Sequence, residues 1–311
     1  MRISLEQFLK TEGGITDVQI RDARRTQQFF GGSILSNLVR LDVIPEFTAE
    51  DLFAAWTGYP VPVQEELQVI PAAIIRLIPA DIALRRQVLP FRRDEKVLYV
   101  ATARADNEPF FRELEHHLGL KVIPRAVLEK RLLSLLERSH GQPREGLSSG
   151  GPVPVLEQLA AASGRQAIGR AAVALGLSRG LSRLLLLGKQ KDCLIAWEAG
   201  GIGVRNESLP ALRLTLQAPS IFASLLLSRS PYMGPVPDLP VHRGLLDVLE
   251  GSAPVSAAMV PVVLRQRTVA AIYADGGPDS GESPEPRVLG TVSVKTALAL
   301  EILILRRKIL A

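Results

Sequence analysis

The fold is decided by three closely spaced segments: Leu77-Ile78-Pro79, Arg85-Arg86-Gln87-Val88-Leu89-Pro90 and Val97-Leu98-Tyr99-Val100-Ala101-Thr102-Ala103. Pro79 suits the first turn of a helix that ends near Arg86. Residues 88–92 and 97–103 have the composition of two strands, with a charged turn at 93–96 between them. The stretch therefore predicts a helix followed by a β-hairpin.

The residues that follow continue a mixed α/β pattern. A helix is expected at 108–118, closed by Gly119, then a strand at 120–125 and a helix at 127–138 with leucines at helical spacing. Together, residues 60–138 predict a small α/β domain.

Upstream, residues 5–57 predict a helix-turn-helix unit that occurs twice, at about 5–27 and 32–57. Gly13-Gly14 ends the first helix, and Thr16 with Gln19 forms a capping-box pattern that opens the second. The third helix begins near Ile34, and Thr48 with Asp51 is expected to start the fourth.

This order of segments resembles the N-terminal domain of the type II secretion and type IV pilus assembly ATPases, the GspE/PilB family, over residues 3–138. A subset of that family, called MshEN, binds cyclic di-GMP. The ATPase core is absent, because no G-x-x-x-x-G-K-[ST] occurs. At the one Gly-Lys pair, Gly188-Lys189, Gln190 follows and Arg183 stands where the first loop glycine belongs. The resemblance implies a regulatory domain that docks on assembly machinery.

The MshEN resemblance also implies a ligand site, because each helix-turn-helix copy is similar to the cyclic di-GMP motif R-L-G-x-x-L-x-x-x-G-x-I. Ser4 stands at the arginine position, Glu6 at the first glycine and Val39 at the second glycine of the second copy. A carboxylate near a dianionic ligand is unfavourable, so the pattern is degraded. The candidate ligand-binding positions are Leu5, Leu9, Gly13, Ile15, Gln27, Gly32 and Leu35.

Residues 139–154 have linker composition and separate residues 1–138 from a second domain at 155–311. Within the first domain, the helical part is 1–58 and the α/β part 60–138. In the second, we expect an Ala-rich helix at 155–175, strands at 183–188 and 193–198, helices at 219–228 and 241–250, a hairpin of 257–264 with 268–274, and a helix at 286–309. This order resembles a GAF-like sensory domain. The fold class expected for the whole chain is α+β.

Composition limits the function classes. The net charge of +5 is carried by 29 Arg and 8 Lys that are spread along the chain, and aromatics make up 5%. Nucleic-acid binding, motivated by net charge alone, is therefore not favoured, since binders gather charge with stacking aromatics. The single cysteine, Cys193, is expected to be a buried thiol. We expect a cytoplasmic protein, with no signal peptide and no membrane span, because Glu301 and Arg306 interrupt the apolar tail.

Three further patterns have simple structural explanations. Gly176-Leu177-Ser178-Arg179-Gly180 matches G-x-S-x-G, but a helix precedes it and a strand follows, the reverse of a hydrolase elbow. His116, His117, His140 and His242 lack metal-ligand spacing and are expected at the solvated surface. The acidic group Asp275, Asp279 and Glu282 lacks EF-hand order and is expected in a flexible loop. No catalytic residue and no metal site is predicted.

These observations favour a non-catalytic, cytoplasmic bacterial adaptor or regulator linked to pilus or secretion machinery or to second-messenger signalling. Its partners are expected to be proteins. Two alternatives stay open: a degenerate cyclic di-GMP receptor, for which that nucleotide would be the ligand and no other cofactor is expected, and a hydrolase that uses Ser178. The helices at 155–175 and 286–309 carry more apolar surface than one sheet face needs, so we expect either full burial or a homodimer through them.

Overall fold

The computed structural model describes residues 3–140, 158–159, 162, 164–250, 254–278, 280 and 282–309. The chain divides into two compact units. One comprises Met1–Gln27 and Gly32–Gly146, and the other comprises Leu147–Ala311 together with Gln28–Gly31. Most of the linker predicted at 139–154 lies outside the described residues, and its first two residues end a helix.

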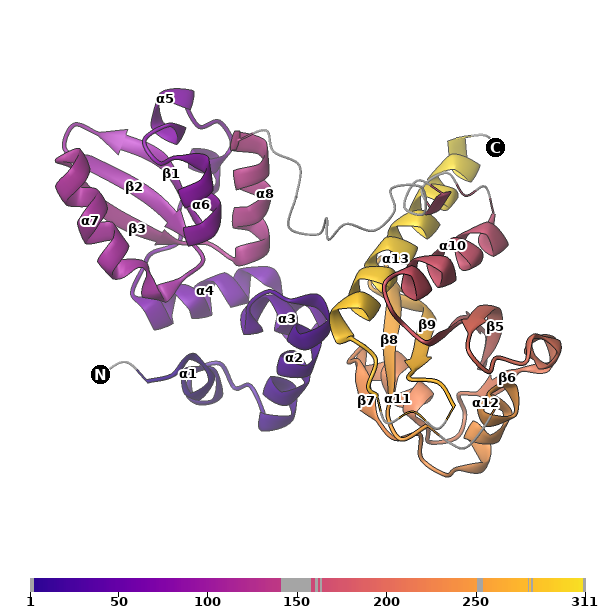
Figure 1. Cartoon of the computed structure of the whole chain (residues 1–311). Coiled ribbons are helices and arrows are strands. Elements are labelled where there is room, and N and C mark those ends of the chain that lie inside the picture. The colour runs from indigo at the N-terminus through magenta and orange to yellow at the C-terminus, as the bar shows by residue number, and fades with distance from the viewer. Residues whose placement is uncertain are drawn as a thin grey trace. The chain divides into compact units, whose positions relative to one another are not determined.

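The first unit begins with the predicted pair of helix-turn-helix copies (Figure 1). The Thr16 capping box is confirmed, since the Thr16 amide donates to Gln19 Oε1 at 2.8 Å and the Gln19 amide donates to Thr16 Oγ1 at 3.3 Å. The fourth helix begins two residues before Thr48, because Pro45 holds extended backbone at the N-cap and the chain turns helical directly after it. The four helices are α1 (Leu5–Thr11), α2 (Asp17–Phe30), α3 (Ile34–Arg40) and α4 (Glu46–Thr57).

The α/β part of this unit is a three-stranded sheet in the order β1-β2-β3. The first two strands form the predicted antiparallel hairpin, and β3 pairs parallel to β2 after a helical crossover that Gly119 closes with a positive φ of 65°. The sequence missed one short helix and two 3-10 turns, at Ala72–Ile75 (α5), Gln64–Leu67 and Ala105–Asn107. The other elements are α6 (Ala80–Arg86), β1 (Val88–Asp94), β2 (Val97–Thr102), α7 (Glu108–Leu118), β3 (Lys121–Ala126) and α8 (Glu129–His140).

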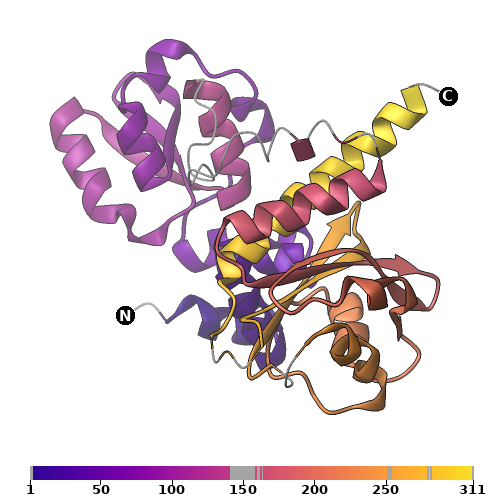
Figure 2. The ribbon, with the colours of Figure 1, turned by 45° about the vertical axis from the view of Figure 1, so that its right-hand side comes forward.

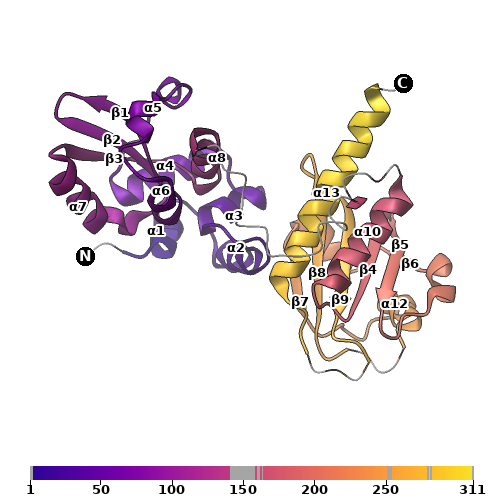
Figure 3. The same ribbon diagram turned by 45° about the horizontal axis from the view of Figure 1, so that its top comes forward.

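The second unit is a six-stranded antiparallel sheet in the order β6-β5-β4-β9-β8-β7, which gives the α+β fold class predicted. On one face α10 and α13 lie side by side (Figure 2, Figure 3). The opposite face packs on α11 and α12. The elements are α10 (Arg165–Ser178), β4 (Arg183–Gln190), β5 (Cys193–Gly201), β6 (Arg213–Thr215), α11 (Ile221–Ser228), β7 (Tyr232–Gly234), α12 (Arg243–Val248), β8 (Ala257–Leu264), β9 (Arg267–Asp275) and α13 (Pro286–Ile309), with 3-10 turns at Asn206–Ala211 and Pro240–His242.

Several expectations for this unit were wrong. The single helix expected at 155–175 is interrupted, because residues 158–159 are helical, Gly164 holds extended backbone and α10 begins at Arg165. Positions 155–157, 160, 161 and 163 lie outside the described residues. The edge strands β6 and β7 were missed because three residues are too few to show alternation. Cys193 is half-buried at the start of β5 rather than buried.

The predicted exposure of His242 differs most from the structure. This residue was expected at the surface but is fully buried, with Nδ1 2.8 Å from the Pro237 carbonyl oxygen and its ring edge-on to Phe222. The letters Val241 and Arg243 on either side of His242 do not reveal which way its side chain points, so only packing could place it.

The C-terminal helix α13 corrects the expectation that Glu301 and Arg306 leave the apolar tail too short for a membrane span. An 18-residue window within Pro286–Lys308 has a mean hydropathy of 1.9, so this helix is long and apolar enough, by length and composition, to cross a membrane. In the structure 44% of that window is buried, and Leu289, Val292 and Leu300 belong to the core between α13, α10 and the sheet.

A buried ion pair closes one end of this sheet. Arg183 begins β4 and Asp275 ends β9, both side chains are fully buried, and Arg183 Nε donates to Asp275 Oδ1 at 2.5 Å. Asp275 also accepts hydrogen bonds from the Tyr273 hydroxyl and, at 2.8 Å, from the Gly277 amide. The expectation of a flexible acidic loop is therefore wrong for Asp275, while Asp279 lies outside the described residues.

Burial, and then the neighbouring Asp275 carboxylate, raises the pKa of Tyr273 far above its ordinary value. Unfolded tyrosine ionises near pH ~10. The folded-state pKa is the higher one, so this contribution to stability is complete below pH ~10 and is lost as the pH rises toward the folded value. We expect one of the four tyrosines to ionise only as the second unit unfolds.

Absorbance at the tyrosinate band, followed against pH together with circular dichroism, measures this step. The Tyr273→Phe variant should lack it. Ionisation of all four tyrosines near pH ~10 with unchanged dichroism would contradict the expectation.

Candidate functional site

Three of the predicted ligand-binding positions pack the core of the helical repeat instead. Leu9, Ile15 and Leu35 have exposed fractions of 0%, 5% and 2% and belong to one apolar cluster. Leu9 and Ile15 therefore offer a ligand almost no surface, whereas Leu35 also lines a small internal cavity. Their matches to the family motif are explained by helix packing.

Two more motif positions make contacts within the repeat. A Cβ at Gly13 would lie 2.7 Å from the Leu9 carbonyl oxygen and 3.3 Å from Leu52, so this glycine allows close packing against its own helix and α4. Gln27 Nε2 donates to the Gly32 carbonyl oxygen at 2.5 Å. Gln27 thus links the two copies of the repeat.

Leu5 and Leu35 come together at a small cavity of about 220 Å³ inside the first unit. Its charged members are acidic. Glu129 Oε1 accepts a hydrogen bond from Gln87 at 2.8 Å, whereas its Oε2 is buried without a partner among the described residues. A Cβ at Gly32 would lie 3.4 Å from this Oε2, so a carboxylate occupies the space beside the motif glycine. The lining residues are Leu5, Ser33, Leu35, Phe53, Trp56, Ala103, Ala105, Asp106, Val127, Leu128 and Glu129.

The two departures from the motif have structural roles. Ser4 is the N-cap of α1, and its Oγ accepts from the Gln7 amide at 3.2 Å. Glu6 forms an ion pair with Arg24, whose Nε donates to Glu6 Oε1 at 2.6 Å. The Arg24 guanidinium is therefore bound to Glu6 and is not available to contact a phosphate.

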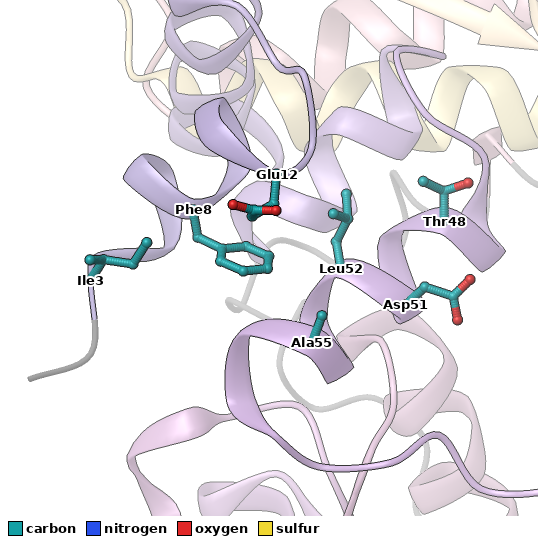
Figure 4. A pocket seen from close by; sticks show the side chains of 7 residues that line it. All are labelled: Ile3, Phe8, Glu12, Thr48, Asp51, Leu52 and Ala55. Atoms are coloured by element: carbon teal, nitrogen blue, oxygen red, sulfur yellow. The ribbon is translucent and has the colours of Figure 1, made fainter.

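A larger groove of about 520 Å³ lies between α1 and α4 (Figure 4). Phe8 projects from α1 toward Leu52 and Ala55 of α4, and these side chains form an apolar floor. It is lined by Ile3, Phe8, Glu12, Thr48, Asp51, Leu52 and Ala55.

The charged groups of this groove are both carboxylates, Glu12 at the end of α1 and Asp51 on α4. Both are exposed, and neither has an ion-pair partner among the residues that the structure describes. Nearby Lys10 pairs with Asp17, and this contact holds the pKa of the Asp17 carboxyl below its ordinary value. In a chain of net charge +5, the groove is thus locally acidic.

Further apolar surface flanks the groove. Ile3 is 49% exposed, and its carbonyl oxygen accepts a hydrogen bond from Trp56 Nε1 at 3.0 Å, which fastens the segment before α1 to α4. Phe47 is 69% exposed and stands one turn before Asp51.

This groove was not predicted from the sequence. One signal was available, because Thr48, Asp51, Leu52 and Ala55 have the spacing i, i+3, i+4, i+7 of one helix face. No local pattern indicated that this face lies opposite Phe8.

The two enzyme-like motifs lie in regular structure. Ser178 is the last residue of α10, and its Oγ donates to the Leu175 carbonyl oxygen at 2.9 Å. A helix thus precedes the serine and β4 follows it, as predicted. Gly188 and Lys189 lie within β4, where a Cβ at Gly188 would overlap the Trp197 ring at 1.7 Å. This glycine makes room for an indole rather than for a phosphate.

Among the residues that the structure describes, no group of three or more His, Cys, Asp or Glu side chains could hold a metal ion.

Comparison with known proteins supports the resemblances. The MshEN domain model matches residues 57–146, so this segment is similar to an MshEN domain. The match begins at the last residue of the helical repeat, so it does not include the seven candidate ligand-binding positions from Leu5 to Leu35. None of the curated protein sequences matches this chain.

Solved structures similar to parts of the chain fall into two groups. The structure described as MshE with cdg is 22% identical, covers 44% of this chain and 99% of its own, and has a TM-score of 0.35. The N-terminal domain of XpsE is 19% identical, with coverages of 43% and 92% and a TM-score of 0.33. The GAF domain of a phosphoenolpyruvate-protein phosphotransferase from Coxiella burnetii is 14% identical, with coverages of 51% and 96% and a TM-score of 0.40.

Proposed function

We propose that this chain is a non-catalytic regulatory adaptor, working in the bacterial cytoplasm on type IV pilus or type II secretion machinery. The observation that carries the proposal is the MshEN domain at 57–146 in a chain whose sequence has no P-loop motif and whose second unit is GAF-like. Domains of this kind are regulatory parts of motor proteins, and here such a part is joined to a sensor-like fold.

The groove between α1 and α4 is the proposed contact with a protein partner. Its open shape, apolar floor and exposed rim suit a peptide segment better than a small cofactor, which is usually enclosed on most sides. The GAF-like unit would then supply the regulatory input.

Cross-linking in the cell of origin tests the adaptor proposal. A tagged full-length chain should enrich pilus or secretion assembly proteins over an untagged control, and the purified chain should not hydrolyse ATP. Recruitment of no assembly or signalling component, with or without added nucleotide, would remove the basis of the proposal.

A degenerate cyclic di-GMP receptor is the second candidate, supported by Gly13, Gln27 and Gly32 at motif positions. We expect the unaltered chain to bind this nucleotide weakly, because Glu6 occupies Arg24 and the carboxylate of Glu129 stands beside Gly32. The double variant Ser4→Arg with Glu6→Gly should gain affinity on the order of 2 kcal/mol, since it adds one guanidinium, frees another and removes a repulsion.

Titration calorimetry measures this gain. Arg24→Ala in the double-variant background is the control and should lose part of it. The loss of the Ser4 cap is expected to lower helix stability by about 1 kcal/mol, so folding is checked by circular dichroism. Tight binding by the unaltered chain, or none by the double variant, would contradict the expectation.

We also propose a homodimer through α13. Val294, Leu298 and Leu305 are 41%, 50% and 44% exposed and lie at helical spacing on the side of α13 away from the core. A second copy would remove this apolar surface from water. Light scattering against concentration should show a dimer that Leu298→Asp weakens, and a monomer at all concentrations would contradict it.

A further inference from the structure

We propose that the groove between α1 and α4 binds a basic amphipathic segment of a protein partner, with an apolar side chain on Phe8 and Leu52 and two cationic side chains at Glu12 and Asp51. The inference rests on the adaptor function proposed above and specifies the chemistry of the partner.

The floor of the groove requires an apolar anchor. Phe8 and Leu52 are half-buried and face each other across the groove, with Ala55 beside them. The groove's volume of about 520 Å³ accommodates a bulky apolar side chain. Ile3 and Phe47 extend the apolar surface beyond the floor. Burying such surface is the main source of affinity when an amphipathic helix enters a groove.

The rim requires positive charge. Glu12 and Asp51 lie on different helices, on two sides of the same floor, and both carboxylates are without ion-pair partners in the described part of the chain. A nucleic acid, an anionic lipid surface or a cyclic dinucleotide would bring phosphates to these carboxylates, and like charges at close range repel. Lys or Arg side chains beside the anchor would instead be attracted.

The groove is short enough to define the segment. The seven residues of α1 make about 10 Å of helix, which matches about two turns of a bound helix. Two turns present one anchor and cations one turn to either side of it. The recognised motif is thus a cation, an apolar residue and a second cation on one helix face.

The test is selection of a random-peptide phage library on the full-length chain. Enriched peptides should carry Leu or Phe flanked by Lys or Arg. A synthetic consensus peptide should bind less tightly as salt rises, and it should shift the amide NMR signals of α1 and α4.

Reversing the charges of the two groove carboxylates tests whether they bind the peptide's cations. Glu12→Lys with Asp51→Lys changes two exposed side chains and should weaken the consensus peptide about tenfold or more. The control Glu95→Lys with Glu113→Lys makes the same change in net charge on exposed residues elsewhere in the unit and should leave binding within about twofold. Circular dichroism checks that both variants fold.

Several outcomes would overturn the proposal: no enriched peptide, an acidic or neutral consensus, equal weakening by both double variants, or NMR shifts away from α1 and α4. The selection uses no assembly component, so the groove chemistry can hold while the link to that machinery fails. Conversely, an assembly protein that binds the charge-reversed chain undiminished would support the adaptor and overturn the groove.

Discussion

Replacing Asp275 with Ala is expected to lower the free energy of unfolding of the second unit by about 3–5 kcal/mol. The change leaves the Arg183 guanidinium buried without its counter-charge, and the Tyr273 hydroxyl and Gly277 amide without their acceptor. The remaining bond, from Arg183 Nη1 to the Glu250 carbonyl oxygen at 3.3 Å, cannot neutralise the charge. Such a loss is a large part of the stability of an ordinary domain.

Denaturant unfolding followed by Trp197 fluorescence in a Trp56→Phe background reports on the second unit alone. Glu301→Ala is the matched control, since it breaks the exposed Arg265–Glu301 pair of the same unit and should cost under about 1 kcal/mol. Adding Arg183→Met to Asp275→Ala should restore part of the loss, because it removes the unpaired charge. A cost for Asp275→Ala as small as that of the control would show that the pair is not stabilising.

Replacing Gly201 with Ala is expected to be the second severe change. Gly201 ends β5 with φ at 108°, and a Cβ there would lie 2.2 Å from the Ser182 carbonyl oxygen and 2.5 Å from Arg183 Cα. Both are backbone atoms at the start of the neighbouring strand β4, so this part of the chain must move. Because Arg183 pairs with Gly201 in the sheet, the movement also disturbs the ion pair.

Gly180→Ala is the control, since Gly180 also has a positive φ, 91°, but open space where a Cβ would lie. In both variants alanine is forced into left-handed backbone, which destabilises the fold. Only in Gly201→Ala does the new Cβ also clash with neighbouring atoms. The free energy of unfolding should therefore fall by at least about 2 kcal/mol more for Gly201→Ala than for Gly180→Ala, in the same fluorescence assay. An equal fall in the free energy of unfolding for the two variants would mean that the end of the sheet can shift without destabilising the unit.

The candidate site was only partly predictable. The motif correctly predicted a repeat of four helices. It assigned Leu9, Ile15 and Leu35 to a ligand because an apolar residue that packs a core and one that contacts a ligand have the same letter and the same spacing. The groove was missed because its two walls, Phe8 on α1 and Leu52 on α4, are far apart in sequence.

The sequence by itself determined the elements whose causes are local. The capping box at Thr16, the turn at Gly119, the hairpin of β1 with β2 and the full extent of α13 all depend on residues within a few positions of one another. What the tertiary structure alone decided is which distant groups meet. Arg183 and Asp275 stand 92 residues apart, and Glu6 finds Arg24 18 residues later in the chain. Neither pairing has a local cause, because the free energy that brings such groups together comes from burying the apolar faces that carry them.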